Sequence, residues 1–424
     1  MKKNIIKIFE TPNNEHFFSG YFNTNVINAL EDKILALRVS FIDRLPGASD
    51  FAEIGYFNFG KLKSDFIVLG TTKAFNWQQG AMLQFLGPDY NQKIIYNDYD
   101  EKKEKYISVI MDINGSIIKK NPAVYAVSPN GDYALTIDYE RHSWFRRGYS
   151  YGNKFDESKK THFSPEDSIS MVELETGKLT DIIRLSDVVE IQPIPSMKNA
   201  IHYLEHMTIS PCGKRFIFFH RWKHVGGIHT RVFVYHIETG KYQLILDSGR
   251  ASHYCWLDNE NILLYGGLPN AANSFRKKGG MAKIVFNAIK PIYKKLVFDG
   301  SKISKTLTGD SYLIINTDSG KARRVATLIS DQDGHPCWMD QEEMFITDTY
   351  ARSKHQMQPA LIGYDLNADS ILFSEKSDSI DKYDETPLRC DFHPKISKSN
   401  TYITIDNMIN NRRGLSIYRL TDDN

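Results

Sequence analysis

The chain is poor in cysteine and has no long apolar run. Its 424 residues include 4 cysteines, Cys212, Cys255, Cys337 and Cys390, and each lies in or just before a different copy of a recurrent segment. Disulfides between such separate copies would need a fortuitous geometry, so we expect reduced thiols. No run of about 18 uninterrupted apolar residues occurs, and the start MKKNIIKIFETPNNEHFF is too short and too polar for a secretory signal. These absences predict a soluble, cytoplasmic protein without an integral membrane segment.

The chain also lacks an excess of charge of one sign. Its 53 basic and 51 acidic residues leave a net charge of +2, which predicts no nucleic-acid partner and leaves any electrostatic attraction to local groups. The spaced motifs CxxC and HExxH are absent as well. A metal site would therefore have to be assembled from residues far apart in the sequence.

A unit that reads turn, strand, turn, strand recurs along the chain. Its clearest copies are SPNGDYALTIDY at Ser128, SPCGKRFIFFH at Ser210, WLDNENILLYG at Trp256, WMDQEEMFITD at Trp338 and HPKISKSNTYITID at His393. Turn residues between short β-branched and aromatic runs are typical of hairpins.

Further apolar runs follow most of these copies. They are SISMVELETGK (168–178), TRVFVYHIETGK (230–241), SYLIINTDSGK (311–321) and ALIGYDLNADS (360–370), and two looser units cover 34–59 and 82–113. The count is about seven units of roughly 40–60 residues, the period of propeller blades. The sequence therefore predicts an all-β fold, a seven-bladed β-propeller forming one domain over residues 1–424 with loop insertions.

The most distinctive insertion covers residues 267–305 and is rich in lysine and arginine. Its apolar residues Met281, Ile284, Val285, Ala288 and Ile289 fall at helical spacing. Three interpretations remain open: a basic lid over an anionic ligand, a helix on a membrane surface, or a solvated excursion.

Histidines recur at one position of the repeat. His206, His253 and His335 precede or begin equivalent strands, and His393 follows Arg389 in the last unit. Residues at one repeat position converge at one end of a propeller, and imidazoles with a carboxylate or thiolate suit Zn or Mn. We expect a divalent metal site formed by His253, His335, Cys390 and His393, with Asp333 and Asp391 as further candidates. Each histidine alone could instead cap a turn or bond a neighbouring blade.

The segment HRWKH places His220 and Arg221 at the end of a strand. An arginine fork pairs with a carboxylate in a bidentate manner, so Arg221 could bind a substrate carboxylate. An ion pair between blades would explain the same residue equally well.

A segment dense in arginine and tyrosine, DYERHSWFRRGYSYG, is predicted as a loop. Its Arg146, Arg147, Tyr149 and Tyr151 suit an acidic glycan, because guanidinium groups bind carboxylates, rings contact sugars and phenols donate protons. A well-packed loop could have the same composition. The residues expected to contact a substrate are Trp77, Gln78, Gln79, Asn97, Arg146, Arg147, His220 and Arg389.

Several longer strings resemble a known family. NWQQGAMLQFLGPD, RRGYSYG, EHMTISPCGKRFIFFHRW, DGHPCWMDQEEMFITDTYA and RCDFHP are similar to the propeller-type polysaccharide lyases, the oligogalacturonate and ulvan lyase group, and to uncharacterised relatives linked to bacterial surface polysaccharide. The resemblance runs from about His16 to the C-terminus.

This resemblance implies β-elimination on a uronate-containing glycan. A cation neutralises the uronate carboxylate, a base removes the C5 proton, and an acid protonates the departing O4. Arg221 matches the arginine that neutralises the carboxylate in the ulvan-type enzymes. Where those enzymes have histidines this chain has Gln78, Gln79 and Asn97, and amides do not transfer protons at neutral pH.

Because amides stand where the ulvan-type enzymes have histidines, other residues would have to transfer the protons. His206 is then expected as the base, and Tyr149 or Tyr151 as the acid. The alternative is a non-catalytic glycan-binding propeller in surface-polysaccharide biosynthesis. A protein-interaction platform of the WD-repeat type is disfavoured, because polar residues gather at one repeat position.

Overall fold

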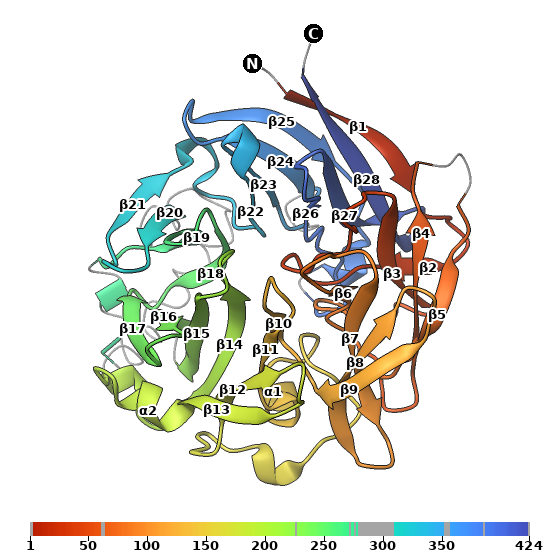
Figure 1. Cartoon of the computed structure of the whole chain (residues 1–424). Helices are drawn as coiled ribbons and strands as arrows, with labels where there is room; N and C mark the ends of the chain where they lie inside the picture. The colour runs from red at the N-terminus through yellow and green to blue at the C-terminus, as the bar shows by residue number, and fades with distance from the viewer. Residues whose placement is uncertain are drawn as a thin grey trace. The chain divides into compact units, whose positions relative to one another are not determined.

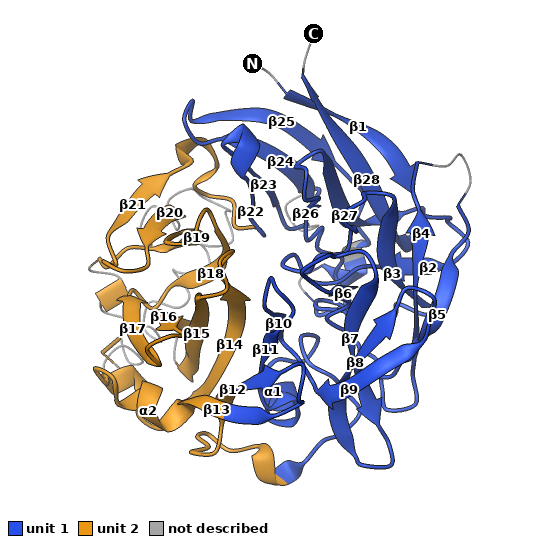
Figure 2. Cartoon of the chain, in the orientation of Figure 1, with its two compact units in different colours: residues 1–157, 171–180, 335–424 blue, residues 158–170, 181–334 orange. Residues whose placement is uncertain are grey.

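The described strands form seven four-stranded sheets, so the chain is a seven-bladed β-propeller, as predicted (Figure 1). A computed structural model of the chain describes residues 3–60, 64–224, 227–270, 273–274, 277–278, 309–351, 357–384 and 386–422. Most of the insertion at 267–305, with its predicted helix, lies outside the described residues. The contacts of the chain group it into two compact units (Figure 2). Unit 1 comprises residues 1–157, 171–180 and 335–424, and unit 2 comprises residues 158–170 and 181–334. That the chain forms one domain stays a prediction.

Four blades belong to unit 1. They are β2 (His16–Phe18), β3 (Lys33–Val39), β4 (Ala52–Asn58) and β5 (Ile67–Thr72); β6 (Gln84–Phe85), β7 (Lys93–Asp100), β8 (Lys105–Asp112) and β9 (Ile117–Pro122); β22 (Cys337–Met339), β23 (Met344–Asp348), β24 (Ala360–Asp365) and β25 (Ser370–Lys376); and β26 (Lys395–Ile396), β27 (Tyr402–Ile409), β28 (Arg412–Asp422) and β1 (Lys3–Glu10).

Two blades belong to unit 2. They are β14 (Ile201–Ile209), β15 (Arg215–His224), β16 (Gly227–His236) and β17 (Lys241–Leu246); and β18 (Ala251–Trp256), β19 (Asn261–Gly267), β20 (Asp310–Asn316) and β21 (Ala322–Val325). The remaining sheet is β10 (Ala126–Val127), β11 (Tyr133–Thr136), β12 (Ser168–Glu173) and β13 (Leu179–Arg184).

The helices of the described residues are few and short. They are α1 (Tyr139–Phe145), α2 (Leu185–Glu190) and the 3-10 turns Glu157–Lys159, Pro195–Met197, Thr327–Ile329, Asp340–Glu342 and Asp381–Tyr383. None of the helices in the described part of the chain has the length and apolar character needed to span a membrane.

The recurrent turn that revealed the repeat has one hydrogen-bond pattern. Gly131 N donates to Ser128 O, and Gly213 N donates to Ser210 O, both at 2.9 Å. The glycines have positive φ angles of 70° and 72°, which glycine adopts without a steric penalty. The Ser128 hydroxyl accepts from Tyr133 N, and the Ser210 hydroxyl accepts from Arg215 N, so the serine holds the start of the next strand.

The last blade is completed by the first strand of the chain. β1 pairs with β28 from Lys3 opposite Asp422 to Glu10 opposite Ser416. A buried ionic group links this blade to the segment after β2: Asp406 accepts from Ser19 N at 2.9 Å, and Lys395 Nζ donates to Ser19 Oγ at 2.8 Å. Burial lowers the pKa of Lys395, although the nearby Asp406 carboxylate opposes the shift.

The middle strands of the blades are apolar on both faces. Ile94, Ile95 and Tyr96 of β7 are consecutive and buried, as are Met344, Phe345 and Ile346 of β23. A strand whose two faces are both buried has no solvent-facing polar positions, which explains why these strands appear in the sequence as continuous apolar runs. Polar residues lie at the ends of the blades, for example His335 before β22 and His393 before β26.

Candidate functional site

In unit 2, adjacent strands bring Arg221 and Glu205 together. Arg221 lies on β15 and Glu205 on β14, and the Arg221 Nη1 donates to Glu205 Oε1. Both side chains are buried, and Arg221 Nη2 also approaches Ala251 O at 3.3 Å. The ion pair of Arg221 is therefore formed within one blade, between its first two strands, and not between blades as the sequence interpretation had it. Arg221 Nε has no hydrogen-bond partner among the described residues.

His206 sits at an irregularity of β14. Its φ angle is +55°, and the pairing with β15 shifts register between Glu205 and Thr208. A bulge of this kind re-aims side chains, and the His206 ring stacks on Phe219 at 5.3 Å between centroids. Burial, reinforced by the Arg221 charge, lowers the pKa of His206 well below its ordinary value, so the imidazole is neutral at pH 7.

The next blade of unit 2 presents His253 at a similar irregularity. The pairing of β18 with β19 shifts register between Ala251 and Tyr254. His253 Nδ1 lies 2.8 Å from Ser252 Oγ and 3.4 Å from Asp333 Oδ1, and Ser252 Oγ donates to Asp333 Oδ2 at 2.7 Å. The His253 ring lies 5.6 Å from that of His206. A carboxylate beside Nδ1 orients the ring and selects the tautomer with its lone pair on Nε2.

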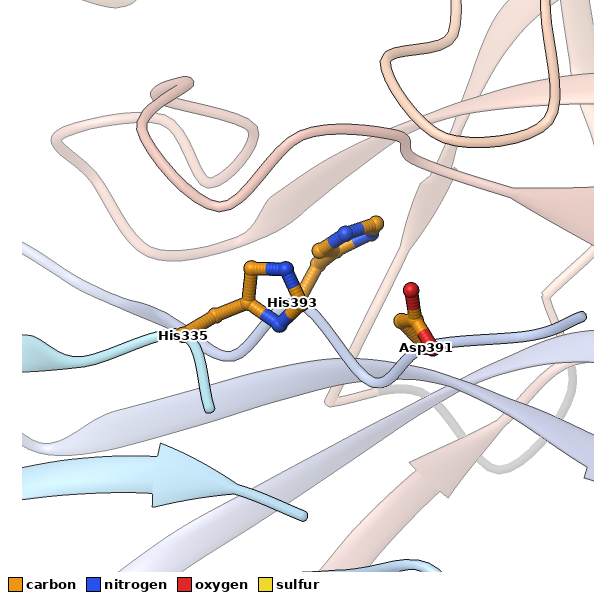
Figure 3. Close-up of side chains that lie close together, drawn as sticks. All are labelled: His335, Asp391 and His393. Atoms are coloured by element: carbon orange, nitrogen blue, oxygen red, sulfur yellow. The ribbon is translucent and has the colours of Figure 1, made fainter. Parts of the chain in front are cut away.

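Unit 1 contains a group suited to a metal ion. His335, Asp391 and His393 each offer one ligand atom, and these atoms lie within 4.8 Å of one another (Figure 3). All three residues are buried, and the two histidines precede β22 and β26. The sequence therefore predicted two imidazoles of this group, and named Asp391 as a further candidate ligand.

Asp348, at the end of β23, orients this group. Its carboxylate accepts from His335 N at 2.7 Å and His393 N at 3.1 Å, and it lies 3.0 Å from His335 Nδ1. A carboxylate that holds one nitrogen of a metal-binding imidazole is a recurrent feature of metal sites. Sequence reasoning missed Asp348, although it ends one of the repeat copies, MFITD, next to the strand that His335 precedes.

Arg389 holds the third member of the group. Its Nε lies 2.9 Å from both oxygens of Asp391, and its Nη2 donates to Tyr149 OH at 2.6 Å. The Arg389 guanidinium also lies over the Tyr350 ring, 5.4 Å from its centroid. Burial lowers the pKa of Arg389, but the charge of Asp391 and the nearby phenols raise it overall, so the guanidinium stays charged.

Two predicted metal ligands lie outside this group. Cys390 packs against the apolar core of unit 1, and burial raises the pKa of its thiol to about 12, which disfavours the thiolate that binds metals. His253 contacts Asp333 in unit 2 instead. None of the four cysteines, all of which are described, forms a disulfide.

The amides predicted to bind substrate are hydrogen-bonded inside the protein. Asn97 Nδ2 donates to Val124 O at 2.7 Å and to Tyr151 OH at 2.8 Å. Gln78 Nε2 donates to Arg389 O, and Gln79 Nε2 donates to Tyr125 OH. These contacts give the three amides a structural task, and their role toward a substrate stays a prediction.

Three further predicted residues are buried in the same way. Trp77 is 1% exposed and donates from Nε1 to Arg44 O at 2.8 Å. Tyr151 is 1% exposed, and burial raises the pKa of its phenol. His220 lies on the face of β15 opposite Arg221, with its Nε2 3.0 Å from His202 Nδ1.

The segment predicted as a loop at 138–152 begins with a helix, so that prediction was wrong for its first half. Asp138 caps α1 by accepting from Glu140 N and Arg141 N, which stabilises a turn of helix that the mixed composition did not reveal. Beyond α1, Arg146 lies over the Tyr149 ring and Arg147 over the Phe155 ring, at 4.1 and 5.7 Å from the centroids.

The sequence matches no protein-family model and no curated protein. The structure is similar to that of an oligogalacturonate lyase from Vibrio parahaemolyticus, with a TM-score of 0.57, 10% identity, and coverage of 99% of this chain and 97% of that chain. It is also similar to an oligogalacturonate lyase in complex with manganese, with a TM-score of 0.59, 13% identity, and coverage of 99% and 98%. The likeness predicted from the sequence strings is thus confirmed for the fold, over nearly the whole chain.

Proposed function

We propose that this protein acts on uronate-containing oligo- or polysaccharides by β-elimination and binds a divalent metal at His335, Asp391 and His393. The observation that carries the proposal is this ligand group, already oriented by the buried Asp348, in a chain with the fold of the oligogalacturonate lyases. One of those lyases was solved in complex with manganese.

The donor set fits a transition metal or Mn²⁺. Two imidazoles and one carboxylate suit Zn²⁺, Mn²⁺ and related ions, and they leave coordination positions for a ligand. A bound cation would coordinate oxygen atoms of an acidic glycan. Asp348 fixes the His335 tautomer that offers Nε2, and Arg389 fixes the orientation of Asp391.

Arg221 is the proposed neutraliser in unit 2. Its Nε is the one donor of the fork without a partner among the described residues, since Nη1 donates to Glu205. A charge-assisted bond from this fork to the uronate carboxylate would acidify the C5 proton and stabilise the enolate that develops.

The base is one of two imidazoles of unit 2. The sequence favoured His206, which is neutral at pH 7 but stacked on Phe219. The geometry favours His253, because Asp333 and Ser252 contact its Nδ1 and thereby direct the Nε2 lone pair toward a substrate proton. For the acid, Tyr149 suits better than Tyr151: Tyr149 is 8% exposed and Tyr151 1%, and the Tyr149 oxygen accepts from Arg389 while its own proton can be donated.

The test is the appearance of an unsaturated product. We expect ultraviolet absorbance to rise when the protein and Mn²⁺ are incubated with oligogalacturonate, and the rise to stop with a chelator. Arg221→Ala should lower the rate by about 100-fold or more, the effect of removing one transition-state charge contact. Arg215→Ala, on the same strand but paired with Asp318, is the matched control and should keep the rate.

Binding without a reaction would point to the alternative role. If a panel of uronate glycans binds and no unsaturated product forms with any metal, elimination is excluded. The non-catalytic glycan-binding propeller would then be the better description.

A further inference from the structure

A cavity lies in unit 1, and its lining includes none of His335, Asp391 and His393. It has a volume of about 410 Å³, within the range of ligand pockets. Its wall is formed where β2 begins, β3 ends and β28 begins, and by the connection between β3 and β4. We call it the outer cavity. Its lining combines basic, acidic and aromatic side chains, among them Arg412, His16, Glu15, Glu53 and Phe51.

The lining of the outer cavity includes Arg412, a cation without an ion-pair partner among the described residues. The side chain of Arg412 has no hydrogen bond or ion pair to any residue of the described ranges, whereas Arg38 pairs with Glu15 at 2.9 Å and Glu53 at 2.5 Å. The charge of Arg412 also acts on His16: burial lowers the pKa of the His16 imidazole, and the charges of Arg412 and Arg413 lower it further. An arginine in this state favours a carboxylate or another planar anion.

The lining also includes hydrogen-bond acceptors. Glu15 and Glu53 share the single guanidinium of Arg38, and each carboxylate can accept about four hydrogen bonds, so acceptor capacity remains. The hydroxyls of Ser40 and Ser49 line the same wall. Acceptors of this kind bind the hydroxyl groups of a sugar.

An aromatic side chain borders the cavity. Phe51 is 55% exposed although it is large and apolar. The C–H face of a sugar ring covers such a ring and removes its apolar surface from water. A cation, acceptors and an exposed ring are thus present around one cavity.

The outer cavity lies at the same ends of the blades as the ligand group. His16 begins β2 opposite Val39 at the end of β3, and Arg412 begins β28, while His335 and His393 precede β22 and β26. Arg413 connects the two places: its backbone N–H donates to His16 Nδ1 at 3.4 Å, and its Nη2 donates to Arg389 O at 2.7 Å. A chain of sugars that reached the ligand group could extend along this end of unit 1.

We propose that the outer cavity is a separate binding site for a uronate residue of an acidic glycan, with its carboxylate on Arg412, its hydroxyls on Glu15 and Glu53, and its ring on Phe51. This assignment rests on the proposed function for its ligand class. A free amino acid, with carboxylate and ammonium groups, is the competing ligand that the same charges would accept.

The test is calorimetric titration of the protein in chelator, which stops turnover, with tetragalacturonate as the probe. Arg412→Ala should weaken binding about tenfold or more, the effect of losing one charge-assisted bond. Arg419→Ala is the matched control, since it removes the same charge from an exposed position on the same strand, β28, and it should bind like the wild type. Phe51→Ala removes the ring without changing charge, and it should also weaken binding.

Several outcomes would overturn the proposal. They are wild-type affinity in Arg412→Ala, equal binding of the carboxyl-reduced neutral tetrasaccharide, the absence of binding by the wild type in chelator, and binding of a free amino acid in place of the glycan. A failure of elimination is separate, because calorimetry reports the outer cavity whether or not a product forms. If elimination occurs while Arg412→Ala binds normally, the outer cavity is excluded and the proposed function stands.

Discussion

At the scale of the residue, the same side chain has different tasks that depend on its hydrogen-bond partner. His335 is oriented by Asp348, and His253 by Asp333 and Ser252, whereas the Nε2 of His220 contacts another imidazole, that of His202. A carboxylate partner raises the basicity and fixes the tautomer of an imidazole. Partners, more than residue type, distinguish the histidines suited to ligation or proton transfer.

The carboxylate that orients His335 should control metal affinity. We expect Asp348→Asn to weaken Mn²⁺ binding about 10–100-fold, because the amide no longer holds the imidazole with a full negative charge. Calorimetric titration with Mn²⁺ measures this loss. Asp340→Asn, an exposed change in the same blade, is the control. Unchanged Mn²⁺ affinity in Asp348→Asn, with wild-type stability in chelator, would contradict the role of Asp348.

Buried neutral histidines should make the protein less stable in mild acid. Burial lowers the pKa of His220 and of His206 well below the ordinary value of 6.5. The unfolded chain therefore binds more protons than the folded chain once the pH falls below 6.5, and the free energy of unfolding decreases. Above 6.5 both states are neutral and this dependence vanishes.

Urea unfolding at about pH 7.5 and about pH 5.5 measures the effect, at most about 1.4 kcal/mol per pH unit for each histidine. His220→Gln should lose part of this dependence, whereas His162→Gln, which changes an exposed ring solvated in both states, should retain it. Equal stability of the wild type at the two pH values would contradict the prediction.

At the scale of the element, short irregularities place the functional side chains. Register shifts in β14 and β18 accompany His206 and His253, and His393 has a φ angle of +43° just before β26. Each departs from regular pairing where a first strand of a blade begins or bends. Such positions re-aim side chains that a regular strand would direct elsewhere.

The N-cap of α1 should contribute measurably to stability. We expect Asp138→Ala to lower the free energy of unfolding by about 1 kcal/mol, because Glu140 N and Arg141 N lose their acceptor. Urea unfolding near neutral pH measures the change. Asp138→Asn or Asp138→Ser should restore most of the stability, since both side chains also cap helices. Full stability of the alanine variant would show that α1 does not depend on this cap.

At the scale of the whole molecule, the repeat was the predictable part. The turns at Ser128–Gly131 and Ser210–Gly213 reveal the period because their geometry requires glycine and benefits from serine. Seven blades follow from that period. Helix α1 was missed because its 7 residues are too few to show an apolar pattern over several turns.

The ligand group could be predicted only in part. The repeat position of His335 and His393 is visible in the sequence. The choice between Cys390 and Asp391 depends on which side of the segment before β26 faces the core. Successive residues of an extended segment point to opposite sides, and the sequence alone did not settle which side was buried. Asp348 was missed because its role comes from a neighbouring strand.

The most direct measurement of the central claim is the mass of the products formed from oligogalacturonate by the protein with Mn²⁺. Elimination adds no water, so we predict a pair of products whose masses sum to that of the substrate, one of them unsaturated. This pair should be lost with His393→Ala and with chelator. Products whose masses sum to substrate plus one water would show hydrolysis, and an unchanged substrate would show no reaction; either result would contradict the account.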